Sequence, residues 1–67
     1  MNWATNAKAH LDGVKASLEA GIAIIDLALP ELEVGSEEEK AALDARAEMV
    51  LAVALVDSAL LFVTPWV

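Results

Sequence analysis

The sequence has no cysteine and no tyrosine, and it has only one histidine and one phenylalanine. Without cysteine the chain can form neither a disulfide nor a thiolate metal site, and a lone His10 cannot build a metal site by itself. A chain of 67 residues buries only roughly 60% of the surface that its unfolded form exposes. Association with other chains is therefore the remaining way to add stability.

Basic residues are scarce as well, with four against eleven acidic ones, which gives a net charge of −7. Nucleic acids and anionic membrane surfaces repel such a chain, so we expect neither as a partner. The chain is nevertheless apolar, with a mean hydropathy of +0.56. Its acidic residues gather between Glu31 and Glu39, whereas residues 49–67 contain only Asp57.

The longest apolar stretch, Met49–Val63, has 15 residues and includes Asp57 and Ser58. A membrane-spanning helix needs roughly 20 apolar residues, so this stretch is more typical of a buried core helix. The first ten residues lack the apolar core of a signal peptide. We expect a soluble protein, cytoplasmic if it is expressed in a bacterial host, and the native compartment stays open.

Local signals predict two helices, at about residues 4–29 and 36–63. Asn2, Thr5 and Asn6 can each cap the start of the first helix, and the sequence does not choose among them. Pro30 disfavours helical geometry at the residue before it, which ends the first helix near residue 29. Thr64-Pro65 ends the second helix in the same way.

The clearest local signal lies between the two predicted helices. Gly35 suits a left-handed position after a helix, and Ser36 follows it as the cap of the next helix. Ser36-Glu37-Glu38-Glu39 is a capping box, in which the Ser36 hydroxyl accepts from the Glu39 amide and the Glu39 carboxylate reaches back. Its three glutamates also face the positive end of the helix dipole.

Two helices with a short connection lie antiparallel. The predicted fold is therefore all-α: one hairpin domain over residues 1–67, which assembles into a multi-chain helical bundle. Both termini should lie at one end of the hairpin, with the acidic connection at the other. Gly13 and Gly21 inside the first helix indicate close approach of another backbone.

The first predicted helix has three kinds of surface on a helical projection. A charged stripe is expected to face water and to hold ion pairs from Lys8 to Asp12 and from Lys15 to Glu19. An apolar seam is expected to face the second helix; its residues are Leu11, Val14, Leu18, Ile25 and Leu29. The remaining flank is mostly alanine, and it suits either another helix or a half-exposed helix surface.

The second predicted helix has a stripe that changes character along its length. Glu37, Lys40, Asp44 and Glu48 begin it, and Leu51, Leu55, Ser58 and Phe62 continue it. Water cannot be the neighbour of both halves, and one helix covers only one side of an apolar helix. A second copy is the nearest source of apolar surface. The predicted interface comprises Leu51, Leu55, Phe62, Ala16, Ala20, Ala23 and Leu27, in an assembly of two to four copies.

Few residues offer chemistry. His10 has no second ligand at suitable spacing, and the glutamates lack the Glu-x-x-His pattern of a di-iron site. Asp57 is isolated in an apolar helix, and it either pairs with Arg46 of another copy or stays solvated. No nucleophile motif or glycine-rich phosphate loop occurs. We therefore expect no enzyme activity, no cofactor and no small-molecule substrate.

The segment from Gly35 through Ser36-Glu37-Glu38-Glu39-Lys40-Ala41-Ala42-Leu43, in a chain without Cys, Tyr or Gln, resembles computationally designed helical proteins. In style the whole chain is similar to de novo designed cyclic homo-oligomers built from short helical hairpins. That resemblance implies a self-associating structural hairpin. The interior glycines and the valine-rich second helix depart from it. A natural acidic adaptor, whose helix pair docks on a larger protein, is the alternative.

Overall fold

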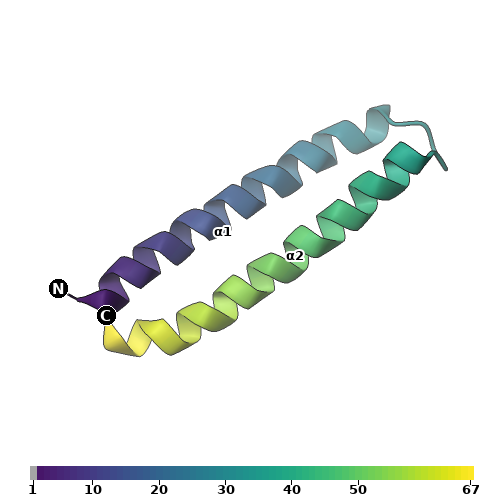
Figure 1. Cartoon of the computed structure of the whole chain (residues 1–67). Coiled ribbons are helices and arrows are strands. Elements are labelled where there is room, and N and C mark those ends of the chain that lie inside the picture. The colour runs from purple at the N-terminus through teal and green to yellow at the C-terminus, as the bar shows by residue number, and fades with distance from the viewer. Residues whose placement is uncertain (1) are drawn as a thin grey trace.

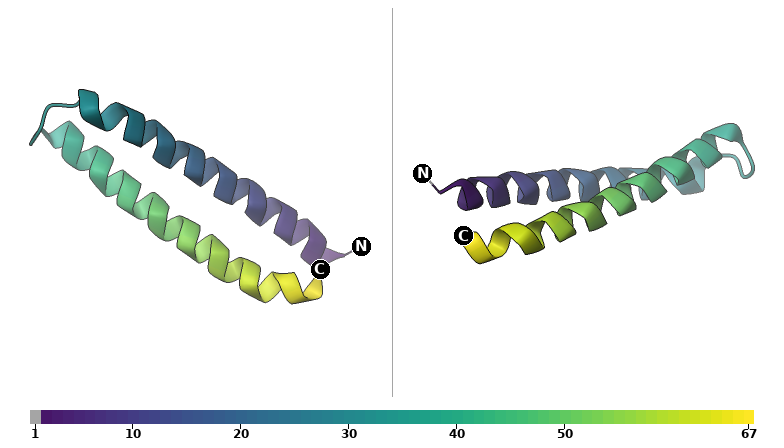
Figure 2. Two further views of the ribbon diagram at one scale, coloured as in Figure 1. Left: turned by 180° about the vertical axis from the view of Figure 1, so that it is seen from behind. Right: turned by 60° about the horizontal axis from the view of Figure 1, so that its bottom comes forward.

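The computed structural model describes residues 2–67, which fold into an antiparallel helical hairpin (Figure 1). Helix α1 spans Trp3–Ala28 and α2 spans Glu37–Val63, and a short 3-10 turn follows each of them, at Leu29–Glu31 (η1) and Thr64–Trp66 (η2). Both termini lie at one end of the hairpin and the connection lies at the other, as predicted (Figure 2). The described residues contain no strand.

The helix boundaries follow from local hydrogen bonding. Asn2 is the residue that caps α1, because its side-chain oxygen accepts from the amides of Ala4 and Thr5. The helical conformation does not stop at Pro30; this residue lies inside η1, the 3-10 turn that follows α1. Pro65 lies inside η2 in the same way, since proline suits the first positions of a helical turn.

The predicted cap of α2 is confirmed. The Ser36 hydroxyl accepts from the Glu39 amide at 3.1 Å and donates to the Glu33 carbonyl oxygen at 2.7 Å. The Glu39 carboxylate accepts from the Gly35 amide at 3.0 Å, one residue before the position expected for a capping box. Gly35 has a φ of 81°, the left-handed conformation that glycine adopts without strain.

The two helices meet along a seam whose residues are spaced alternately three and four positions apart. This spacing is typical of helices that cross at a shallow angle and wind around each other in a left-handed supercoil (Figure 2). The half-buried or buried seam positions of α1 are Ala4, Ala7, Leu11, Val14, Leu18, Gly21, Ile25 and Ala28. Those of α2 are Ala42, Arg46, Met49, Val53, Val56, Leu60 and Val63. The predicted seam of α1 is thus confirmed, with small residues between the large ones.

The two interior glycines differ in their surroundings. A methyl group at Gly21 would lie 3.1 Å from the Met49 sulfur, so Gly21 makes room for a side chain of α2. A methyl group at Gly13 would meet nothing within 4 Å. The predicted close approach of a backbone is therefore wrong at Gly21, where a flexible side chain fills the space, and Gly13 faces open space.

Replacement of Ser36 by alanine tests the cap of α2. We expect Ser36→Ala to lower the free energy of unfolding by about 0.5 to 2 kcal/mol, because the Glu39 amide loses its acceptor. Denaturant titration followed by circular dichroism measures this change. Ser58→Ala is the control, since Ser58 is exposed in the middle of α2, and equal effects of the two changes would contradict the cap.

Candidate association surface

The hairpin has an unusually large surface for its mass. Its accessible surface is 4916 Å², whereas a compact monomer of this size exposes about 4,100 Å². The shape explains the excess, because the principal extents are 50 × 15 × 12 Å. Ala4 is the one hydrophobic residue that is buried within residues 2–67. Two helices in one layer cannot enclose a core.

The seam divides this surface into two faces. Leu11, Leu18 and Ile25 are seam residues of α1. The residue just before each of them, and the residue two positions after it, point to the same side of the seam. On α2, the residues at the same offsets from Arg46, Val53 and Leu60 point to that side too. We call this side the open face; its residues are His10, Gly13, Ser17, Ala20, Ile24 and Leu27 of α1, and Ala45, Glu48, Ala52, Leu55, Ala59 and Phe62 of α2.

The opposite side, which we call the ion-pair face, carries two salt bridges between the helices. Lys15 Nζ lies 2.8 Å from Asp57 Oδ1, and Arg46 Nε donates to Asp26 Oδ1 at 2.6 Å. These pairs correct the expected partners of three residues, because Lys15 pairs with Asp57 rather than Glu19, and Arg46 pairs within the chain. Asp57 is half-exposed and bonded to α1, so no second copy is needed to neutralise it.

The charged stripe of α1 is therefore not simply a solvent face. Lys8 and Asp12 form the predicted pair at 2.8 Å. Lys15 and Asp26, however, contact charges of α2 from the edge of the seam. The sequence could not reveal these contacts, because they depend on the register between the helices.

These ion pairs shift the titration of their members. The hydrogen bond from Arg46, followed by its positive charge, lowers the pKa of Asp26 below the ordinary value of 3.8. The hydrogen bond to Asp57, followed by the charge of that carboxylate, raises the pKa of Lys15 above 10.5. All of these side chains are well exposed, so each pair stabilises the hairpin only modestly.

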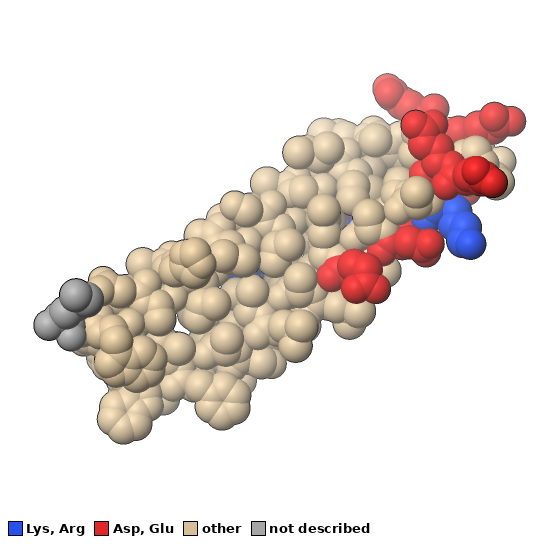
Figure 3. Space-filling model, in the orientation of Figure 1, with Lys and Arg blue, Asp and Glu red and all other residues tan. Residues whose placement is uncertain are grey.

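The open face lacks charge over the half that carries the termini. Figure 3 shows this half almost entirely tan, with the acidic residues gathered toward the connection. Residues 26–48 contain eight of the eleven acidic residues and two of the four basic ones. Six of the seven net negative charges therefore lie in the half of the hairpin that carries the connection.

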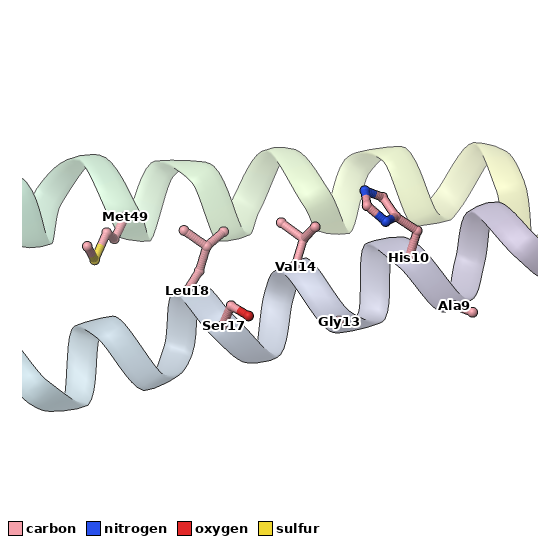
Figure 4. Close-up of a pocket in the computed structure, with 7 residues that line it drawn as sticks. All are labelled: Ala9, His10, Gly13, Val14, Ser17, Leu18 and Met49. Carbon is pink, nitrogen blue, oxygen red and sulfur yellow. The ribbon is translucent and has the colours of Figure 1, made fainter.

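A shallow groove of about 590 Å³ runs along the open face between the helices (Figure 4). Its lining is Ala9, His10, Gly13, Val14, Ser17, Leu18 and Met49. Figure 4 shows six of these residues along α1, from Ala9 and His10 past Gly13 to Leu18, with Met49 as the contribution of α2. His10 is exposed, and within residues 2–67 no group of three His, Cys, Asp or Glu residues could hold a metal ion.

Every residue of the interface predicted from the sequence is exposed on the hairpin. Leu27 is 79% exposed, Phe62 78%, Leu55 71% and Leu51 59%, and Ala16, Ala20 and Ala23 are exposed too. Ile24, which the predicted set does not include, is 67% exposed and lies on the open face about one turn before Leu27. Its signal in the sequence was its position one residue before Ile25 of the seam.

By length and composition, one helix within residues 2–67 could cross a membrane. The helical stretch Glu37–Trp66 has 30 residues, and none of its most apolar window is buried. It is longer than the 15-residue stretch considered from the sequence because it also includes the charged first part of α2, residues 37–48, and the three residues of η2. Asp57 lies within that stretch and pairs with Lys15 of α1, so crossing a membrane would strip or bury an ion pair.

Comparison with known proteins found no matching family model, curated protein or solved structure.

The pKa of Asp26 tests the ion-pair face. Because Arg46 favours the Asp26 carboxylate, this pair stabilises the hairpin above pH 3.8, and the stabilisation is lost as the pH falls through the lowered pKa. We expect carbon-detected NMR titration to give Asp26 a pKa below 3.8, which returns toward 3.8 in Arg46→Gln. A titration of Asp26 that is the same in both proteins would contradict the pairing.

Proposed function

We propose that this chain is a self-associating structural hairpin whose open face is covered by further copies of itself. The observation that carries the proposal is the surface excess of roughly 800 Å² over a compact monomer. A standard protein–protein interface buries about 800 Å² on each partner. The hairpin therefore exposes about as much surplus surface as one interface would remove.

The composition of the exposed surface supports the same proposal. Leu27, Leu55 and Phe62 are each more than two-thirds exposed, and scattered apolar residues of this size would need no explanation. Here all three lie on the open face, spread along its length and separated by small residues that let another helix approach closely. Exposed apolar surface gathered on one face is typical of an interaction site.

A second copy is a better partner than a membrane or a nucleic acid. The net charge of −7 repels anionic lipid and phosphate backbones alike. The ion-pair face would also bring Lys8, Asp12, Lys15 and Asp57 toward the bilayer if the termini end were inserted. In this proposal the chain has no enzyme activity, no cofactor and no small-molecule substrate, and it resembles designed homo-oligomers in function as well as style.

Association and folding should be linked by mass action. We expect the midpoint of thermal unfolding to rise with protein concentration and native mass spectrometry to show one discrete oligomer of two to four copies. A midpoint that stays constant over about a hundredfold dilution, with a monomeric mass, would overturn the proposal. A largely unfolded chain that becomes helical only with another protein would favour an adaptor instead.

Two exposed leucines of α2 form a matched pair for locating the interface. Leu55, on the open face, is 71% exposed, and Leu61, about a third of a turn around α2 toward the ion-pair face, is 76% exposed. We expect Leu55→Lys to dissociate the oligomer, because the interface would have to desolvate a charge in every copy. Leu61→Lys should leave the oligomer intact when both are compared by sedimentation velocity. Equal behaviour of the two variants would show that the open face is not the interface.

A further inference from the structure

The open face of α1 carries both protrusions and a groove. Ile24 and Leu27 protrude, being 67% and 79% exposed. Between His10 and Ser17 the same face is hollow, because Gly13 has no side chain and nothing lies within 4 Å of the place where a methyl group would be. On α1, Ser17 lines the groove, and the small residue Ala20 lies between Ser17 and the two large residues.

Resting on the proposed function, we propose that two copies pack antiparallel through their open faces, with a two-fold axis between Ser17 and Ala20. Reversal about that axis places Ile24 of each copy over Gly13 of the other. It also places Leu27 beside His10, since the spacings along the helix are equal. Both grooves of the pair are then filled by the same two side chains.

Helix α2 gives the same axis independently. The ion pairs place Lys15 beside Asp57 and Asp26 beside Arg46, which fixes how the two helices are aligned along the long axis of the hairpin. In this alignment Ser17 lies at the same height along the axis as Leu55, and Ala20 at the same height as Ala52. An axis midway between Ala52 and Leu55 places Leu55 of one copy over Ala52 of the other, and Phe62 over Ala45. Each large side chain of α2 therefore also meets a small one.

The charge distribution selects this orientation over a parallel one. A parallel pair would bring two ends of net charge −6, from residues 26–48, within about 10 Å of each other, which is about one Debye length at 0.1 M salt. An antiparallel pair places these ends at opposite ends of a body about 50 Å long. The uncharged half of each open face then lies opposite the more acidic half of the other.

The area also fits a stable dimer. Two separate hairpins expose 4916 Å² each, and a compact protein of twice the mass exposes about 6,800 Å². If two hairpins formed a dimer as compact as such a protein, the dimer would bury roughly 3,000 Å² of accessible surface in total. Obligate homodimers typically bury about 2,000 to 5,000 Å².

Substitution of Gly13 separates the assembly from the single hairpin. A Cβ at position 13 meets nothing within 4 Å, so the hairpin has open space where a leucine would begin, but that leucine would compete with Ile24 of the second copy in both grooves. We expect Gly13→Leu to stay helical and to raise the dissociation constant about a hundredfold, as overpacking at two symmetric contacts implies. Ala47→Leu is the control, since Ala47 is exposed outside the open face, and it should leave the dissociation constant unchanged.

Cysteine cross-linking tests the orientation, and the chain contains no cysteine of its own. Gly13 and Ile24 are about 16 Å apart along one helix, too far for a disulfide within the chain. We expect Gly13→Cys/Ile24→Cys to form a covalent dimer on mild oxidation, whereas each single variant stays uncross-linked. Cross-linking of both single variants would overturn the antiparallel arrangement, because each residue would then lie beside its own counterpart in another copy.

The remaining outcomes distinguish the two proposals. A dimeric mass without cross-linking of the double variant, or a dimer indifferent to Gly13→Leu, would overturn the antiparallel packing while self-association stands. A trimeric or tetrameric ring would overturn the two-fold axis in the same way. A monomeric mass of the unmodified chain would overturn self-association itself.

Discussion

Two antiparallel helices contact each other along a single line, and the rest of this structure depends on how little that line can bury. Gly21 makes room for the Met49 side chain along this seam, yet only Ala4 among the hydrophobic residues described is buried. Hydrophobic burial is the main favourable term in folding. A hairpin with so much exposed apolar surface would gain more of that term if another layer covered it, which is the basis of the proposed self-association.

The distribution of charge complements this requirement. The ion-pair face holds the contacts between Lys15 and Asp57 and between Asp26 and Arg46, and these contacts fix the register of the helices. They do not cover the open face. The acidic end near the connection keeps the hairpin solvated and disfavours parallel neighbours. One face thus carries ion pairs within the chain, and the open face stays exposed on the single hairpin.

The local features of the fold could be predicted from the sequence because they depend on near neighbours. Gly35, Ser36 and Glu39 are close enough in the chain to specify the start of α2, and Pro30 and Pro65 mark the helix ends within a few residues. The two-helix architecture followed from those signals. The multi-chain assembly remains a prediction.

The register between the helices could not be predicted in the same way. Whether Lys15 meets Glu19 or Asp57 depends on the path of the connection and on the packing of Gly21 against Met49. The same register decides that Ser17 and Leu55 lie level, which a helical projection of each helix alone does not show. The groove over Gly13, to which Met49 of α2 contributes, became visible only once both helices were in place.

Small-angle X-ray scattering of the purified chain tests the central claim most directly, because it reports mass and shape together. If open faces cover each other in an antiparallel pair, forward scattering will give twice the mass of one chain, and the maximum dimension will stay close to the 50 Å length of one hairpin. A single-chain mass with a radius of gyration near 15.4 Å would contradict the account, because the open face would then be stable in water.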